Sequence, residues 1–285
     1  MSKKASIQFN WVFILVAGAI FIIFFTTIAL KYKSIQEEKT NLEILNNLDT
    51  AITSLQSSPF KTTTSINLPL ATRFTCTNNR QAIKIGTTQY ATNNIISAPE
   101  KLKGEVILSS TQLSLPFKIA TLYYILPASQ QYIFVYNDQT REKLENIRQD
   151  LSLLENIAYE QEPVEEQPEA TYIYLTSPGK NKIRLSDTSI TFPGKEPMPY
   201  YNNQHLYSLL FSHQPECISS IIQQELAAKT KLYINKISML QSQDCNYALI
   251  SSKISQLLQN PQLQNQEAII QLNKQLINQD CPAVF

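Results

Sequence analysis

An uncharged run from Trp11 to Leu30 constrains this chain more than any other feature of its sequence. Only Gly18, Thr26 and Thr27 interrupt its Val, Ile, Leu, Phe and Ala residues. A helix rises about 1.5 Å per residue, so this run would cover about 30 Å, the thickness of the hydrocarbon core of a bilayer. The run therefore predicts a transmembrane helix over residues 11–30, preceded by a short tail, residues 1–10.

The residues around the run favour a retained anchor. Trp11 and Tyr32 bracket it, and their rings are predicted to lie at the membrane interface. A secretory signal has an apolar region of only about 7–15 residues and a small-residue cleavage site. Here the stretch TTIALKYK passes directly from apolar to charged residues. A cleaved signal peptide and a buried helix of a soluble protein are the alternatives.

One cluster of small residues lies inside the run. Close packing of helices in a membrane requires small side chains, because these let two backbones approach each other. Ala17, Gly18 and Ala19 form such a cluster. We therefore predict that these three residues are helix-packing positions in the membrane.

The charges that flank the run predict its orientation. Lys3, Lys4 and the N-terminal amine precede it, whereas Lys31 and Lys33 follow it. Basic residues accumulate on the cytoplasmic side of a membrane span. This small bias predicts a single-pass protein with a cytoplasmic N-terminus and its C-terminal domain outside.

The residues directly after the run continue a helical pattern. Leu45, Leu48, Ile52 and Leu55 recur at spacings of three and four, which places them on one helix face. The pattern stops before Pro59, because the residue preceding a proline avoids the helical conformation. Residues 31–58 are therefore predicted to form a helical stalk, either continuous with the span or separated from it by a kink.

Residues 59–200 have the pattern of a β-rich ectodomain. Short stretches with period-two alternation, such as QAIKIG, GEVILSS, QYIFVYN and TYIYLT, predict strands, whereas IATLYYIL fits either a helix or a buried strand. One helix is predicted over 138–158, with Asp138 as its cap and apolar residues on one face. Residues 160–170, EQEPVEEQPEA, predict an acidic, proline-containing linker.

The remaining residues, 201–285, predict a helical subdomain. Apolar residues recur at helical spacing over 203–212, 216–241, 246–259 and 263–279. The fold class predicted for the whole chain is α+β. It combines the N-terminal transmembrane helix and its stalk, a mixed, mainly antiparallel β domain, and a C-terminal helical bundle.

All four cysteines follow the run, and none belongs to a C-x-x-C motif, so neither a zinc nor a redox site is indicated. An even number in an anchored domain is typical of disulfides outside the cell. Four buried free thiols are the alternative. If the last three helices run up, down and up, Cys245 and Cys281 lie at the same end. Cys217 would then lie about 35 Å from Cys245, too far to pair. The second pair, Cys76 with Cys217, follows by elimination.

Composition excludes two classes of partner. The part of the chain after the run is nearly neutral, since all 23 acidic residues and all basic residues except Lys3 and Lys4 follow it. Nucleic-acid binders need a basic face. The five glycines are scattered, so they form neither a P-loop nor a G-x-G-x-x-G motif. We therefore expect no nucleic-acid or nucleotide partner.

Residues that could carry catalysis are sparse. His205 and His213 are eight positions apart, which is not the spacing of a helical zinc site. The pairs Glu37-Glu38 and Glu165-Glu166 lie in polar segments, whereas a glycosidase acid needs a dry pocket. No G-x-S-x-G motif is present. We predict no catalytic residues, no metal site, no cofactor and no enzymatic activity.

Several stretches carry a resemblance to a known group. They are QFNWVFILVAGAI, IISAPEKLKG, LSLPFKIATLYYIL, PYYNNQHLYSLLFS and the terminal CPAVF. The chain resembles a loose group of uncharacterised single-pass membrane proteins of small-genome archaea, in which an N-terminus like that of a type IV pilin carries an ectodomain. Lys4-Ala5-Ser6 fits the pilin processing pattern. Asn10 departs from it, because pilins often have Glu at the fifth mature position.

These observations predict a structural or interaction protein of the cell envelope. Its expected partners are the lipid bilayer and other envelope or membrane proteins. A pilin-like subunit that assembles through its N-terminal helix is one alternative. An envelope hydrolase without a recognisable motif is the other.

Overall fold

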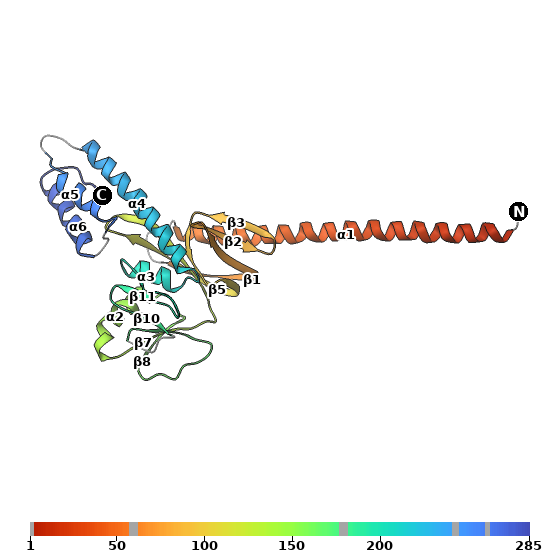
Figure 1. The fold of residues 1–285 in the computed structure, drawn as a ribbon, viewed down its shortest axis with the longest axis horizontal. Helices are drawn as coiled ribbons and strands as arrows, with labels where there is room; N and C mark the ends of the chain where they lie inside the picture. The colour runs from red at the N-terminus through yellow and green to blue at the C-terminus, as the bar shows by residue number, and fades with distance from the viewer. Residues whose placement is uncertain (1–2, 57–61, 177–181, 241–244, 260–262) are drawn as a thin grey trace. The chain divides into compact units, whose positions relative to one another are not determined.

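The computed structural model shows an α+β protein with one long N-terminal helix and two mixed sheets (Figure 1). The chain divides into two compact units, Met1–Asn47 and Leu48–Phe285. The fold class predicted from the sequence is confirmed at this level. The structure describes residues 3–56, 62–176, 182–240, 245–259 and 263–285.

The N-terminal helix, α1 (Lys3–Gln56), contains the predicted span and most of the predicted stalk. Its assignment as one helix agrees with the continuous alternative rather than the kinked one. Among the described residues, α1 is the one helix long and apolar enough to cross a membrane, a property that signal sequences share. Within it, the hydroxyl of Thr27 donates to the carbonyl of Ile23 at 2.7 Å, which satisfies this polar group without water.

The last turns of α1 belong to the Leu48–Phe285 unit. Leu48, Ile52 and Leu55 are buried there, which confirms the apolar face predicted from their spacing. The Ser110 hydroxyl donates to the carbonyl oxygen of Leu55 at 3.4 Å. These turns are therefore part of the core of the unit.

The first sheet has the strand order β3-β2-β1-β5-β6-β4. All its neighbours are antiparallel except β4 and β6, which are parallel. Asn78 and Asn79 have positive φ in the two-residue turn between β1 and β2, where such angles suit the strand twist. The strands are β1 (Thr62–Thr77), β2 (Arg80–Ile85), β3 (Thr88–Thr92), β4 (Ile95–Ser97), β5 (Lys101–Ser114) and β6 (Lys118–Pro127).

The second sheet has the order β12-β11-β10-β9-β7-β8. Its β8, β7, β9 and β10 are parallel neighbours, and β11 and β12 add antiparallel pairs at one edge. This parallel part was not predicted from the sequence. The strands are β7 (Tyr132–Tyr136), β8 (Ile157–Gln161), β9 (Thr171–Tyr174), β10 (Ile183–Leu185), β11 (Ser189–Thr191) and β12 (Met198–Pro199).

The helix predicted over 138–158 is shorter than expected. A 3-10 turn, η1 (Asp138–Thr140), leads into α2 (Arg141–Asp150), and residues 157–161 form β8. The cap is Asn137 rather than Asp138, because the Asn137 side chain accepts from the backbone N–H groups of Gln139 and Thr140. The acidic linker predicted over 160–170 begins inside β8, and its Val164 packs against buried residues of β7 and β9.

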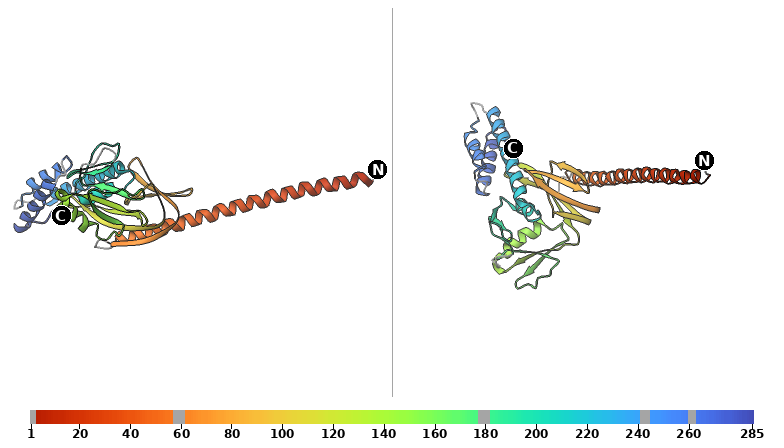
Figure 2. Two further views of the ribbon diagram at one scale, coloured as in Figure 1. Left: turned by 90° about the horizontal axis from the view of Figure 1, so that it is seen from below. Right: turned by 45° about the vertical axis from the view of Figure 1, so that its right-hand side comes forward.

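Four more helices follow, of which α3 (Asn203–Leu210) and α4 (Pro215–Leu240) lie nearest the sheets. Figure 2 shows α5 (Ala248–Gln256) and α6 (Leu263–Asn278) beside the C-terminal half of α4. The predicted C-terminal bundle is not confirmed as a separate body. Ile218 and Ile222 of α4 share one core with strand residues such as Leu126 and Phe134.

One aromatic side chain after α3 joins the two sheets. The centre of the Phe211 ring lies 5.5 Å from the ring centre of Tyr124 on β6 and 5.2 Å from that of Tyr132 on β7. Both pairs are edge-to-face. All three residues are buried. Such aromatic pairs stabilise the folded state beyond the effect of burying their apolar area. The sheets and α3 are thereby held as one body, and this body carries the cleft described below.

Candidate functional site

Of the predicted membrane residues on α1, Ala17 is half-buried and the others are exposed. Trp11 is 66% exposed and Tyr32 is 64% exposed. Ala17, Gly18 and Ala19 lie on a stretch of helix where a side chain added at Gly18 would meet nothing within 4 Å. These positions are therefore open to lipid or to a second helix.

The four cysteines form two disulfides. Cys245 is bonded to Cys281, with a Cα–Cα distance of 5.8 Å, and Cys76 is bonded to Cys217, with a distance of 6.4 Å. This is the pairing predicted from the sequence. The Cys245–Cys281 disulfide joins the segment before α5 to the segment after α6. The Cys76–Cys217 disulfide joins β1 of the first sheet to the start of α4. Free cysteines are absent from the described residues.

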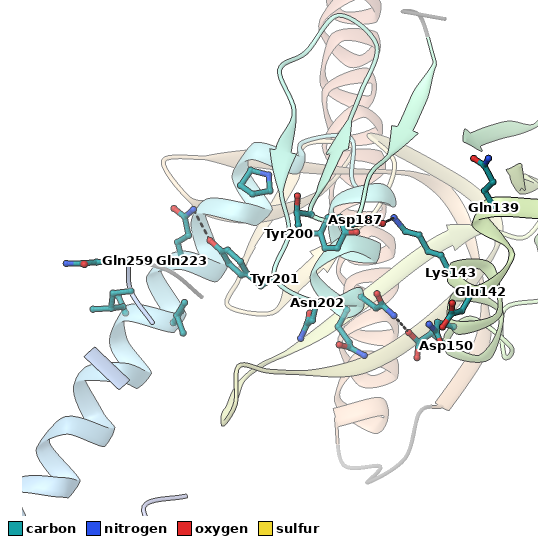
Figure 3. Close-up of a pocket in the computed structure, with 18 residues that line it drawn as sticks. Gln139, Glu142, Lys143, Asp150, Asp187, Tyr200, Tyr201, Asn202, Gln223 and Gln259 are labelled. Carbon is teal, nitrogen blue, oxygen red and sulfur yellow. Dashed lines mark hydrogen bonds and ion pairs between the residues drawn. The ribbon is translucent and has the colours of Figure 1, made fainter. Parts of the chain in front are cut away.

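A cleft of about 1500 Å³ lies in the Leu48–Phe285 unit (Figure 3). One wall comes from η1 and α2, the floor from the β10–β11 turn and residues 199–204, and the other wall from α4 and the residues just after α5. The lining residues are Gln139, Glu142, Lys143, Asn146, Asp150, Asp187, Thr188, Pro199, Tyr200, Tyr201, Asn202, Asn203, Gln204, Gln223, Leu226, Ala227, Leu258 and Gln259.

Lys143 joins the α2 wall to the β10–β11 turn. Its ammonium group donates to the carbonyl oxygen of Ser186 at 2.5 Å and lies 3.2 Å from the Asp187 carboxylate. Burial lowers the pKa of Lys143, although Asp187 acts in the opposite direction. The Tyr200 hydroxyl also donates to the Ser186 carbonyl, at 2.7 Å. Burial, with a smaller effect of Asp187, raises the pKa of Tyr200 to about 12.

Asp150 lies at the end of α2 and lines the cleft. Its carboxylate accepts from the Asn203 amide at 2.8 Å and from the Tyr207 hydroxyl at 3.1 Å. Burial and the Asp150 charge raise the pKa of Tyr207 far above its ordinary value. These two protein donors fix the position of the Asp150 carboxylate in the cleft lining.

The sequence PYYNNQ, residues 199–204, forms the cleft floor. Asn202 caps α3, since its side-chain oxygen accepts from the His205 N–H at 3.0 Å. Its amide group donates to the carbonyl of Ser114 on β5 at 3.1 Å. The Tyr201 hydroxyl accepts from the Gln223 amide of α4 at 3.2 Å. The floor is thus attached to the first sheet and to one wall.

His205 is fully buried beneath this floor. Its Nδ1 accepts from the Tyr201 N–H at 3.4 Å, and its ring packs against the Tyr201 ring at 4.6 Å. Within the described residues, its Nε2 has no hydrogen-bond partner. Burial lowers the pKa of His205 to about 4. His213 has a different partner from His205, since the backbone N–H of His213 donates to the Ala98 carbonyl at 3.1 Å.

The buried histidine makes stability depend on pH. His205 has a pKa of about 4 in the folded protein and about 6.5 when unfolded. The unfolded chain therefore binds more protons as pH falls between these values. The neutral His205 side chain therefore makes its full contribution to the free energy of unfolding above pH 6.5. This contribution falls by about 3 kcal/mol by pH 4. Urea unfolding at pH 7.5 and pH 4 should show this extra loss in the wild type but not in His205→Gln. Equal losses in both proteins would contradict the assignment.

Of the two predicted carboxylate pairs, Glu165-Glu166 forms an unexpected contact. The Glu166 carboxylate accepts from the Tyr174 hydroxyl and from the Lys182 ammonium, which lies 4.7 Å from the centre of the Tyr174 ring. The hydrogen bond from Lys182, followed by that from Tyr174, lowers the pKa of Glu166. Glu166 and Lys182 thus form an exposed ion pair beside the buried Tyr174 rather than an acid–base dyad.

Comparisons with known proteins do not extend this description. No protein-family model matches the chain, and neither curated proteins nor solved structures give a significant match. In the described residues, no group of histidine, cysteine and acidic side chains could hold a metal ion. The cleft was not predicted from the sequence, although the cluster of tyrosines and amides in PYYNNQ is a signal that could have indicated it.

Proposed function

We propose that this protein is a membrane-anchored binding protein whose 48–285 domain lies outside the cytoplasm and holds its ligand in the cleft. The observation that carries the proposal is the pair of disulfides, because such bonds persist in oxidising environments outside the cytoplasm. The uncharged, exposed part of α1 supplies the anchor, with the N-terminus in the cytoplasm.

The cleft supports binding better than hydrolysis. Its three carboxylates are those of Glu142, Asp150 and Asp187. A general acid at neutral pH needs a carboxyl group in a dry, apolar setting. The Asp187 side chain is 96% exposed, Glu142 is exposed on α2, and the Asp150 carboxylate already accepts hydrogen bonds from Asn203 and Tyr207. We therefore propose a protein without catalytic activity.

One observation favours a second candidate, a pilin-like subunit that assembles through its N-terminal helix. α1 carries both the apolar stretch and the buried residues Leu48 and Ile52, so it belongs to the domain as well as to the anchor. Cross-linking Ala17→Cys in isolated membranes would give a ladder of oligomers for this candidate. Monomers alone, as expected for the control Ile22→Cys on another helix face, would contradict it.

Extraction of native membranes tests the anchor. After carbonate washing, the chain should remain in the pellet, and its intact mass should include residues 11–30 because the apolar helix is retained in the bilayer. Release by detergent is the positive control. A mature chain that begins after Leu30, found in the soluble fraction, would identify the segment as a signal peptide and contradict the proposal.

A further inference from the structure

We infer that the cleft recognises a neutral, polyhydroxylated chain, that is, an oligosaccharide of several sugar units. This inference rests on the proposed function, because it specifies the ligand of the same cleft. Four features support it: the hydrogen-bonding groups of the lining, the sign of its charge, the position of its two tyrosines, and its size and edges (Figure 3).

Side-chain amides dominate the lining. Seven of its 18 residues are Asn or Gln, and they come from both walls and the floor, for example Gln139, Asn202 and Gln223 (Figure 3). Each amide offers a carbonyl acceptor and an NH₂ donor in one plane. Neighbouring hydroxyl groups of a sugar, each able to donate and accept, match that arrangement. Asn202, Asn203 and Gln223 already make hydrogen bonds within the protein, so a ligand would meet their remaining donor and acceptor sites and the other four amides. A ligand without hydroxyls would leave the sites that it covers without a partner, which weakens binding.

The charge of the lining disfavours anions. Three carboxylates face one basic side chain, Lys143, whose ammonium is already engaged by the Ser186 carbonyl and Asp187. A phosphate, a nucleotide or an acidic polymer would therefore meet net negative charge. The same carboxylates accept hydrogen bonds from hydroxyl groups. The electrostatics thus favour a neutral ligand with many O–H donors.

Two tyrosine rings lie on the floor between the walls. The Tyr200 hydroxyl is bonded to the Ser186 carbonyl, and the Tyr201 hydroxyl accepts from Gln223, so each ring is held at its polar end. Both residues are half-buried. An aromatic ring fixed in this way offers a flat apolar surface at little cost in conformational entropy. The C–H face of a sugar ring can pack on it while its hydroxyls reach the amides.

The size and edges of the cleft separate a sugar chain from other neutral ligands. Its volume of about 1500 Å³ exceeds the roughly 300–1,000 Å³ typical of small-molecule pockets. An extended peptide would use an open strand edge. The lining residue that lies in an edge strand is Pro199 of β12, which has no N–H to donate. The cleft therefore fits a chain bound by side chains.

The test is a titration of the full-length protein in an amine-oxide detergent, which has no sugar headgroup. The probes are hexasaccharides of glucose, mannose and N-acetylglucosamine, with neutral and basic decapeptides as the comparison, measured by calorimetry. We expect saturable binding of at least one hexasaccharide. Gln223→Ala removes one hydrogen bond and should weaken it about tenfold. Tyr201→Ala should weaken it by at least as much, whereas Tyr201→Phe, which keeps the ring, should lose less.

The matched control is Gln224→Ala, since Gln224 is also exposed on α4 but does not line the cleft. It should bind like the wild type. Absence of binding to all three hexasaccharides, or binding that Gln223→Ala leaves unchanged, would overturn the inference. Peptide binding that requires Gln223 and Tyr201 would also overturn it but would leave the proposed binding function intact. Cleavage of a bound hexasaccharide would support the ligand class and contradict the proposed lack of catalysis.

Discussion

The double variant Cys76→Ala/Cys217→Ala should lose about 5 kcal/mol of unfolding free energy, because its disulfide closes a long loop in the unfolded chain. The two cysteines are 141 positions apart and join β1 to α4. Since domains of this kind have about 5–15 kcal/mol in total, this loss is about a third or more of the free energy of unfolding. Urea unfolding of the full chain in detergent, followed by circular dichroism, measures the difference.

The second disulfide provides the matched comparison. Cys245→Ala/Cys281→Ala opens a loop with a separation of 36 positions and should lose about 4 kcal/mol, less than the first variant. Reduction of the wild-type protein should reproduce the sum of both losses. Unfolding midpoints that do not change in either variant would show that neither bond constrains the unfolded chain.

Two arginines placed in the predicted span should remove the protein from membranes. Phe21 and Phe24 lie near the middle of residues 11–30 and are exposed on α1. An arginine at the centre of a span costs about 2.5–3.5 kcal/mol for insertion, and each phenylalanine lost contributed favourably. Phe21→Arg/Phe24→Arg should therefore disfavour insertion by about 6–8 kcal/mol. The carbonate-wash fraction of expressed protein measures the effect.

The same two substitutions outside the span serve as the control. Gln36 and Thr40 are exposed on α1 after Lys33, beyond the predicted membrane interface at Tyr32. Gln36→Arg/Thr40→Arg should remain in the membrane pellet like the wild type. Equal retention of all three proteins would contradict the transmembrane assignment of residues 11–30.

The elements predicted best from the sequence were those whose pattern is local and strong. The spacing of Leu48, Ile52 and Leu55 identified the buried face of α1, because one helix face repeats every three to four residues. Strands β2 and β5 were indicated by the alternating stretches QAIKIG and GEVILSS. The helix over 138–158 was extended too far, since Leu151 and Leu154 continue the helical spacing and are buried, although α2 ends at Asp150.

The cleft and the parallel sheet could not be predicted in the same way. Pairing of β7 with β8 and β9 depends on contacts between distant segments, which a local pattern does not encode. Asp150, Tyr201 and Gln223 lie on three different elements and share a cleft only after folding. The cysteine pairing could be predicted because two cysteines form a disulfide only if their Cα atoms lie within about 7 Å of each other. The predicted bundle was not confirmed, since α4 also packs on strands.

Location outside the cytoplasm is the central claim, and the state of the cysteines in native membranes tests it most directly. Membranes are isolated with free thiols blocked, the protein is digested without reduction, and linked peptides are identified by mass spectrometry. We expect two linked pairs, one containing Cys76 and Cys217 and the other Cys245 and Cys281, with no blocked cysteine. Four blocked thiols would place the domain in a reducing compartment and contradict the claim.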